Sequence, residues 1–237
     1  MPFTFKQFHV DDSRCGMKVS TDAVLLGAWA EVRPDCQLLD IGTGSGVLAL
    51  MAAQRGARQV VAVELDAAAA AQARENFSAS PWPERLQLRH EAIQRFVPDQ
   101  SFDAILCNPP YFQSGARSER CDRRALARHH DGLTQPELLT AIVRLLSPEG
   151  CASLILPMAE AQQLLQMAPQ YDLHLSRYCE VRTTPAKPVS RLLLSLSAKR
   201  SPPHAESLVI RQSDGRYSID FCRLTEAFYL NTGSQRP

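Results

Sequence analysis

Four short and almost continuous apolar runs lie between residues 37 and 108, and helical patterns separate the first three from one another. The runs cover residues 37–42, 59–65, 86–92 and 102–108, and the helices are expected over 45–55 and 66–77. Strands that alternate with helices pair in parallel through right-handed crossovers, and nearly continuous apolar strands are buried on both faces of a sheet. The sequence therefore predicts an α/β fold in which helices flank a mostly parallel sheet.

The second half of the chain continues this pattern and then changes it. A helix is expected over residues 135–146 and a fifth strand over 151–157. Two further strands, over 174–185 and 189–200, are joined by a short connection and are predicted to form an antiparallel pair at the sheet edge, which gives seven strands in all. A closing helix is expected over 220–230.

The segment before the first strand contains one more helical pattern. Ser20 or Thr21 can cap a helix whose apolar residues follow at helical spacing. Because 237 residues, 45% of them hydrophobic, suffice for one large core, we expect a single domain over 1–237. Within it, residues 1–35 are expected to cap the cofactor and substrate site, and residues 36–237 to form the catalytic core.

Composition and charge argue against several classes of protein. The net charge of +1 gives no overall field that would favour nucleic acid or a membrane. The chain starts without a signal-peptide pattern and has no apolar run of membrane-spanning length, so a cytoplasmic protein without a membrane partner is expected. Seven scattered cysteines without a C-x-x-C pair, and six histidines without ligand spacing, predict neither a disulfide framework nor a bound metal.

The first strand ends in the glycine loop DIGTGSG (residues 40–46), which opens the next helix. Glycines at such a turn let a ligand approach the backbone closely. The dinucleotide-binding fingerprint would need a glycine at position 47, where this chain has Val47. The acid Asp40 disfavours a pyrophosphate and suits a cation, and S-adenosylmethionine carries an ammonium and a sulfonium but no phosphate. The loop therefore favours S-adenosylmethionine over a nicotinamide cofactor.

Glu64 ends the second strand. A carboxylate there can accept hydrogen bonds from two ribose hydroxyls, a role that fits both NAD and S-adenosylmethionine. Ligands of an open parallel sheet bind beyond the carboxyl ends of its strands. We therefore expect Glu64, the glycine loop and the end of the fourth strand to share one site.

The fourth strand ends abruptly in Asn108-Pro109-Pro110-Tyr111. An amine on an aromatic base attacks poorly because its lone pair is delocalised, and accepting hydrogen bonds from both amine hydrogens makes the nitrogen more tetrahedral. The Asn108 side-chain oxygen and the Pro109 carbonyl can be these acceptors, and the adjacent prolines hold them in place. Tyr111 offers a face on which a base can stack. The four residues predict methyl transfer to an amine by positioning and polarisation.

In order and spacing, these motifs resemble those of class I S-adenosylmethionine-dependent methyltransferases with an NPPY motif, and more closely those of the bacterial tRNA1(Val) adenine-N6 methyltransferases. The similar blocks are FTFKQF (3–8), MKVSTDAVLLGAWA (17–30), LDIGTGSGVLALMAAQR (39–55), VELDAAAAAQARENF (63–77), SPWPERL (80–86), NPPY (108–111), LVIR (208–211), Tyr217 and LTEAFYL (224–230). The resemblance implies a Rossmann-like fold, S-adenosylmethionine as cofactor and a tRNA substrate. The implied reaction is methylation of an adenosine N6 amine, that of the anticodon-loop adenosine of valine tRNA.

The resemblance also implies which residues contact the cofactor, with Thr21 and Asp22 bordering its methionine end. The full expected set is Thr21, Asp22, Asp40, Gly42, Thr43, Gly44, Gly46, Glu64, Leu65, Glu91, Ala92 and Asn108. The family usually has an Asp near the end of the third strand that contacts the cofactor's adenine amine. This chain has Ala92 there, preceded by Glu91, so either Glu91 or a backbone group is expected to take that role.

Residues 112–132 form the most basic segment of the chain and directly follow the proposed reaction centre. We expect this segment to bind phosphates of the substrate RNA. The expected RNA contacts are Arg117, Arg120, Arg123, Arg124, Arg128 and His129. A charged, solvated loop without a partner is the alternative.

Other functions fit parts of the sequence. The same chemistry can act on a ribosomal guanine N2 or a protein glutamine N5, but glutamine-specific relatives usually carry an extra amino-terminal helical domain, and only about 35 residues precede the first strand here. A catalytically silent RNA-binding protein could retain the fold, although its motifs would then have no reason to be intact. An NAD oxidoreductase is the weakest alternative because Val47 breaks its fingerprint.

Overall fold

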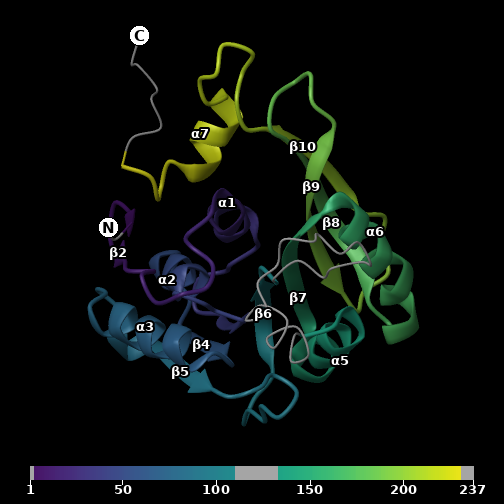
Figure 1. The fold of residues 1–237 in the computed structure, drawn as a ribbon. Coiled ribbons are helices and arrows are strands. Elements are labelled where there is room, and N and C mark those ends of the chain that lie inside the picture. Colours follow the sequence, from purple (N-terminus) through teal and green to yellow (C-terminus); the bar gives the residue numbers. More distant parts are fainter. Residues whose placement is uncertain (1–2, 110–132, 231–237) are drawn as a thin grey trace, which may run out of the picture.

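The computed structural model describes residues 3–109 and 133–230 of the chain. Their central feature is a sheet whose eight strands lie in the order β10-β8-β9-β7-β6-β3-β4-β5 (Figure 1). In chain order these strands are β3 (Gln37–Ile41), β4 (Gln59–Glu64), β5 (Leu86–His90), β6 (Phe102–Cys107), β7 (Leu146–Pro157), β8 (His174–Arg182), β9 (Val189–Ser197) and β10 (His204–Val209).

The strands from β7 to β5 are all parallel, as the alternation of strands and helices predicts. β9 runs antiparallel to both β7 and β8, which confirms the expected antiparallel pair. The sheet has one strand more than expected, because β10 pairs in parallel with β8 at the outer edge. Leu208 is the only buried residue of β10, so this strand has no apolar run by which the sequence could reveal it.

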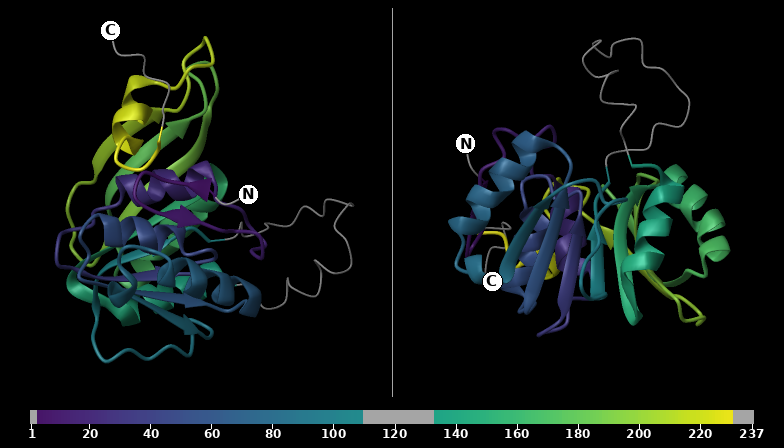
Figure 2. Two further views of the ribbon diagram at one scale, coloured as in Figure 1. Left: turned by 90° about the vertical axis from the view of Figure 1, so that its left-hand side faces the viewer. Right: turned by 90° about the horizontal axis from the view of Figure 1, so that it is seen from below.

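Helices cover both faces of the sheet (Figure 2). On one face lie α1 (Thr21–Trp29), α2 (Val47–Gln54), α3 (Ala67–Ser78) and α7 (Ile219–Thr225), and on the other lie α5 (Gln135–Leu145) and α6 (Met158–Met167). Neighbouring strand residues point to opposite faces, so Leu38 joins the first core cluster and Leu39 the second. The sequence did not predict α6, and α7 ends at Thr225, earlier than expected. None of the described helices is long and apolar enough to span a membrane.

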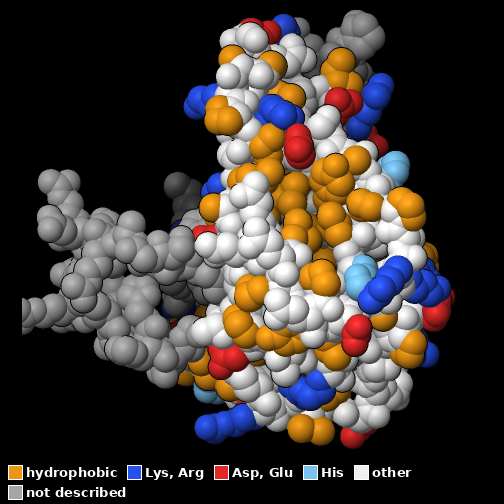
Figure 3. Space-filling view, turned by 90° about the vertical axis from the view of Figure 1, so that its right-hand side faces the viewer, with side chains coloured by type: hydrophobic (Ala, Val, Ile, Leu, Met, Phe, Trp, Pro, Cys, Tyr) orange, Lys and Arg blue, Asp and Glu red, His pale blue; other side chains and the backbone are white. Residues whose placement is uncertain are grey.

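Figure 3 views the molecule from the side on which α6 and β8 lie. Apolar side chains gather near the centre of this face, and charged side chains lie mostly around them. The second core cluster reaches the surface through partly buried residues that include Leu165, Leu175 and Tyr178.

The two ends of the described chain meet beside α2. A short hairpin of β1 (Phe3–Thr4) and β2 (His9–Val10) begins the chain, and Phe5 pairs with Tyr229 near the other end. The Phe5 ring stacks on Phe8 with centroids 4.6 Å apart and on Tyr229 with centroids 6.1 Å apart. These aromatic contacts hold the β1–β2 hairpin against the other end of the described chain.

The register of the parallel strands brings their carboxyl ends to one edge of the sheet. Ile41 lies opposite both Val63 and Cys107, so the loops that follow β3, β4 and β6 start side by side. β9 is antiparallel and therefore begins at this same edge, where Arg191 pairs with Pro157. The topology thus places the carboxyl ends of β4, β3, β6 and β7 and the start of β9 side by side.

Candidate active site

The glycine loop is a tight turn between β3 and α2. The backbone amides of Gly42 and Thr43 donate hydrogen bonds to the Val63 carbonyl at 2.9 and 3.2 Å, which ties the loop to β4. Gly42, Gly44 and Gly46 all have φ between +56° and +87°, a region that favours glycine. A Cβ added at Gly42 or Gly44 would meet nothing within 4 Å, so this side of the loop faces open space that a ligand can enter.

A cavity of about 110 Å³ lies in front of this loop. Its walls come from three parts of the chain that are distant in sequence, namely residues 17–23, residues 42–48 and the Asn108–Pro109 pair. Of the expected site residues, the cavity brings together Asp22, Gly42, Thr43, Gly44, Asn108 and Pro109. Thr21 is the exposed first residue of α1 and does not line it.

Asp40 lies beneath the glycine loop and does not line the cavity. Its side chain is fully buried, and Thr43 Oγ1 donates a 2.5 Å hydrogen bond to Asp40 Oδ2. Burial raises the pKa of Asp40 to about 7, against the opposing effect of the Thr43 hydrogen bond. Oδ1 makes no hydrogen bond of normal geometry within the described part of the chain. Asp40 thus shapes the loop from below and, with a pKa of about 7, carries its full negative charge only at higher pH.

Glu64 is held by three backbone amides. Its Oε2 accepts a hydrogen bond from Gly44, and its Oε1 accepts from Leu65 and Asp66, all at 2.8 Å. A carboxylate has about four acceptor positions, two on each oxygen, so Oε1 is fully used and Oε2 can still accept one hydroxyl donor. Leu65 is 51% exposed and forms an apolar surface beside this carboxylate. Glu64 can therefore offer a ribose hydroxyl one acceptor, and Leu65 can offer a purine ring an apolar contact.

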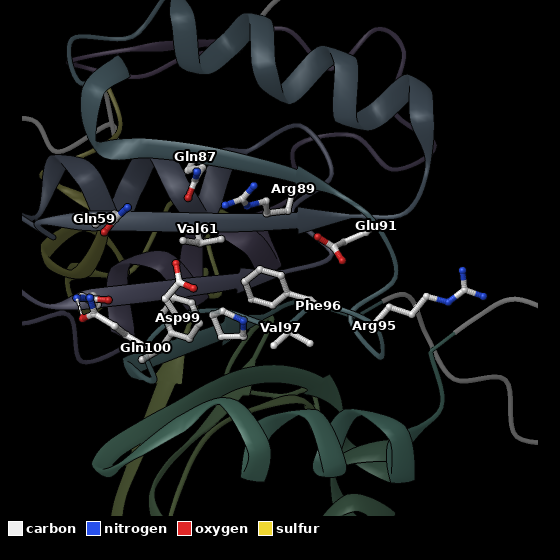
Figure 4. A pocket seen from close by; sticks show the side chains of 13 residues that line it. Gln59, Val61, Gln87, Arg89, Glu91, Arg95, Phe96, Val97, Asp99 and Gln100 are labelled. Atoms are coloured by element: carbon white, nitrogen blue, oxygen red, sulfur yellow. Dashed lines mark hydrogen bonds between the residues drawn. The ribbon is translucent and has the colours of Figure 1, made fainter.

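The end of β5 lies next to Glu64, because the Glu91 amide donates to the Glu64 carbonyl at 3.1 Å. Ala92 then starts a turn in which its carbonyl accepts from Arg95 at 2.9 Å. Figure 4 shows Glu91 at the end of β5, where it lines a polar groove of about 380 Å³ together with Arg89 and Arg95. Glu91 and Ala92 are near Glu64 but do not line the cavity that contains Asn108.

Asn108 follows β6 directly and is half-buried, and Pro109 is buried. Both line the cavity opposite the glycine loop. The other two residues of the predicted corner, Pro110 and Tyr111, lie outside the described residues. So do the expected RNA contacts Arg117, Arg120, Arg123, Arg124, Arg128 and His129.

The structure adds one charged residue that the sequence did not reveal. Arg191 of β9 donates from Nε to Asp22 Oδ2 at 2.8 Å, and the two side chains are 27% and 20% exposed. Asp22 also stands in the first turn of α1, where a negative charge is favourable. An Arg at the start of a strand has no motif around it, so only the antiparallel direction of β9 shows that it reaches the site.

Comparison with known proteins places this geometry in a family. The Methyltransferase small domain family matches residues 19–144, more than half of the chain. Relatives from Photobacterium profundum and Shewanella loihica, both named tRNA1(Val) (adenine(37)-N6)-methyltransferase, are 52% and 48% identical to it. The alignments cover 96% and 97% of this chain and 98% and 99% of the relatives. This chain belongs to the tRNA1(Val) (adenine(37)-N6)-methyltransferase family. The family predicted from the sequence is thereby confirmed.

Solved structures similar to this methyltransferase share its fold. A predicted O-methyltransferase from Agrobacterium tumefaciens aligns with a TM-score of 0.65 at 17% identity, over 87% of this chain and 96% of its own. The glycopeptide N-methyltransferase MtfA, in complex with S-adenosyl-L-homocysteine, aligns with a TM-score of 0.56 at 14% identity, over 78% of this chain and 92% of its own. The likeness confirms the predicted Rossmann-like fold of class I methyltransferases.

Proposed function

We propose that this methyltransferase transfers a methyl group from S-adenosylmethionine to the N6 amine of an adenosine in tRNA, the anticodon-loop adenosine of valine tRNA. The observation that carries the proposal is the cavity in which Asn108 and Pro109 face the glycine loop. This cavity offers space for a methyl donor next to hydrogen-bond acceptors for an amine. The names of the relatives that align over nearly the whole chain supply the nucleotide and the tRNA.

The residues at the carboxyl edge fit S-adenosylmethionine. Gly42 and Gly44 leave open space in front of their backbone, and Glu64 is held by backbone amides with one acceptor position on Oε2 left for a ribose hydroxyl. Leu65 would lie against the adenine, and Asp22 would attract the ammonium of the methionine end. When bound, S-adenosylmethionine supplies a methyl group on a positively charged sulfur.

Asn108 and Pro109 would hold the amine that accepts the methyl group. The Asn108 side-chain oxygen and the Pro109 carbonyl each accept one amine hydrogen, which turns the nitrogen lone pair out of conjugation with the ring. Because Pro109 is buried and fixed at the end of β6, these acceptors need little reorganisation during the reaction. Tyr111 would stack on the base, and the basic segment 112–132 would bind the phosphates of the tRNA.

We also propose which role each part of the chain has. Residues 1–35 cap the cofactor and substrate site, and residues 36–237 form the catalytic core. A tRNA substrate would place the protein in the cytoplasm.

The test is incubation of the protein with tritiated S-adenosylmethionine and bulk tRNA from a strain that lacks the activity, followed by nucleoside analysis by mass spectrometry. N6-methyladenosine in valine tRNA is the expected product, and label in another nucleoside or in no RNA would reject the proposal. Two variants separate the roles. Asn108→Ala should lower turnover heavily and leave most cofactor binding, whereas Glu64→Ala should mainly weaken cofactor binding. Normal turnover by Asn108→Ala would contradict the mechanism.

A further inference from the structure

Residues 11–20, which we call the cap, form one wall of the cavity although they contain neither helix nor strand. Met17, Lys18 and Val19 of the cap line the cavity opposite the glycine loop. Cys15 is the only buried residue of the cap, so little apolar burial holds it in place. Its position must therefore depend on polar contacts.

The contacts that join the cap to the rest of the protein converge on α3, where Glu75 forms an ion pair with Arg14 and the other two partners, Gln72 and Asn76, are buried. Gln72 and Asn76 are four residues apart, so they lie on the same face of the helix. They are only 1% and 6% exposed. Gln72 Oε1 accepts hydrogen bonds from Ser13 Oγ at 3.3 Å and from Arg14 Nε at 3.0 Å.

Asn76 connects the cap to the opposite wall of the cavity. Its Oδ1 accepts from the Asp11 amide at 3.0 Å, and its Nδ2 donates to the Asp11 carbonyl at 2.8 Å. The same Nδ2 donates to the carbonyl of Ser45 in the glycine loop, also at 2.8 Å. One buried amide group therefore binds both walls, and a buried amide that loses its partners is costly.

Hydrogen bonds within the cap connect the residues held by Asn76 to the residues that line the cavity. Asp12 Oδ2 accepts from the Val19 amide at 2.9 Å, and Lys18 Nζ donates to the Asp12 carbonyl at 2.6 Å. The end of the cap that lines the cavity is thus tied back to the residue next to Asp11. Holding Asp11 in place consequently holds residues 17–19 over the glycine loop.

We propose that Asn76 is a positioning residue that clamps the cap to the glycine loop and thereby sets how tightly S-adenosylmethionine is retained. This inference rests on the proposed function, because it takes the cavity as the place of the cofactor's methionine end. Asn76 does not line the cavity and acts through the Asp11 and Ser45 backbone.

The experiment measures S-adenosylmethionine binding by calorimetry and amide hydrogen exchange of residues 11–20 in the unaltered protein and in Asn76→Ala. We expect the dissociation constant to rise roughly tenfold or more. We also expect faster exchange in the cap and a raised KM for S-adenosylmethionine with a nearly unchanged kcat, the pattern of a lost binding contact. Ser78→Ala is the matched control, because it removes a side-chain hydrogen bond to the Arg74 carbonyl within the same helix. This control should behave like the parent protein.

If Asn76→Ala does not fold, Asn76→Leu takes its place, because leucine fills a similar volume and still removes the hydrogen bonds to Asp11 and Ser45. It should also raise both the dissociation constant and the exchange rate of the cap. Unchanged affinity or unchanged cap exchange in a folded variant would overturn the clamp. Failure of the unaltered protein to bind S-adenosylmethionine would instead overturn the proposed function, so the two failures are distinguishable.

Discussion

Replacing Gly46 by alanine tests how tightly the glycine loop is packed against α3. Gly46 has a φ of +87°, and an added Cβ would lie 2.5 Å from Cε1 of Phe77. The left-handed backbone costs a residue with a Cβ about 1–2 kcal/mol. Forcing a methyl group into a packed interior costs about 1–3 kcal/mol more. We expect Gly46→Ala to lower the free energy of unfolding by about 2–5 kcal/mol, the sum of these two costs.

Gly215 provides the matched control for the backbone cost alone. Its φ is +85°, and an added Cβ would meet nothing within 4 Å. In urea denaturation Gly215→Ala should therefore lose only about 1–2 kcal/mol. Adding Phe77→Leu to Gly46→Ala should recover part of the difference, which a double-mutant cycle would measure as coupling. Equal losses in the two alanine variants, or additive effects of Gly46→Ala and Phe77→Leu, would refute the packing argument.

Three further predictions concern charge. The pKa of Asp40 is raised by burial from 3.8 to about 7, so the folded, ligand-free protein holds this proton more tightly than the unfolded chain does. The resulting stability, about 4 kcal/mol, should be full below pH about 4 and lost as the pH rises to about 7, and Asp40→Asn should remove this part of the pH dependence of urea denaturation. Arg191→Ala breaks the 2.8 Å ion pair with Asp22 and should lower the free energy of unfolding by about 1–2 kcal/mol; thermal unfolding that matches the parent would contradict this. Replacing Arg123 and Arg124 by alanine should weaken tRNA binding and flatten its dependence on salt, and equal affinity at several salt concentrations would reject their role.

The parallel half of the fold could be predicted from the sequence because the patterns that indicate it are local. A buried strand, a glycine loop and an amphipathic helix follow one another, and right-handed crossovers leave few ways to arrange them. The carboxyl ends of β3, β4 and β6 then meet by necessity. Consequently Asn108 and the glycine loop could be assigned to one site without any knowledge of long-range contacts.

The parts that the sequence did not predict depend on contacts between distant residues. The position of Arg191 follows from the antiparallel direction of β9, and the role of Asn76 from its closeness to Asp11 across a loop. β10 has too few buried residues to produce a pattern. Asp40 remains a predicted cofactor contact, but the sequence did not show that its side chain lies on the same side of β3 as Leu38, under α2, and does not line the cavity.

The position of Asp40 also explains why a glycine loop of this shape need not bind phosphate. The amino-terminal end of a helix attracts anions because its amides are unpaired and its dipole is positive there. Gly46 caps α2 without a side chain, so this end is electrostatically available. Asp40 lies beneath it, and the Ala49 amide of the first turn lowers the pKa of Asp40 against the stronger effect of burial. When it is ionised, this carboxylate offsets the positive end of the helix dipole. Because it lies beneath the loop, the open side of Gly42 and Gly44 stays free for a ligand. In its ionised form this one buried acid thus favours a ligand that carries positive charge, in a loop geometry shared with dinucleotide-binding folds.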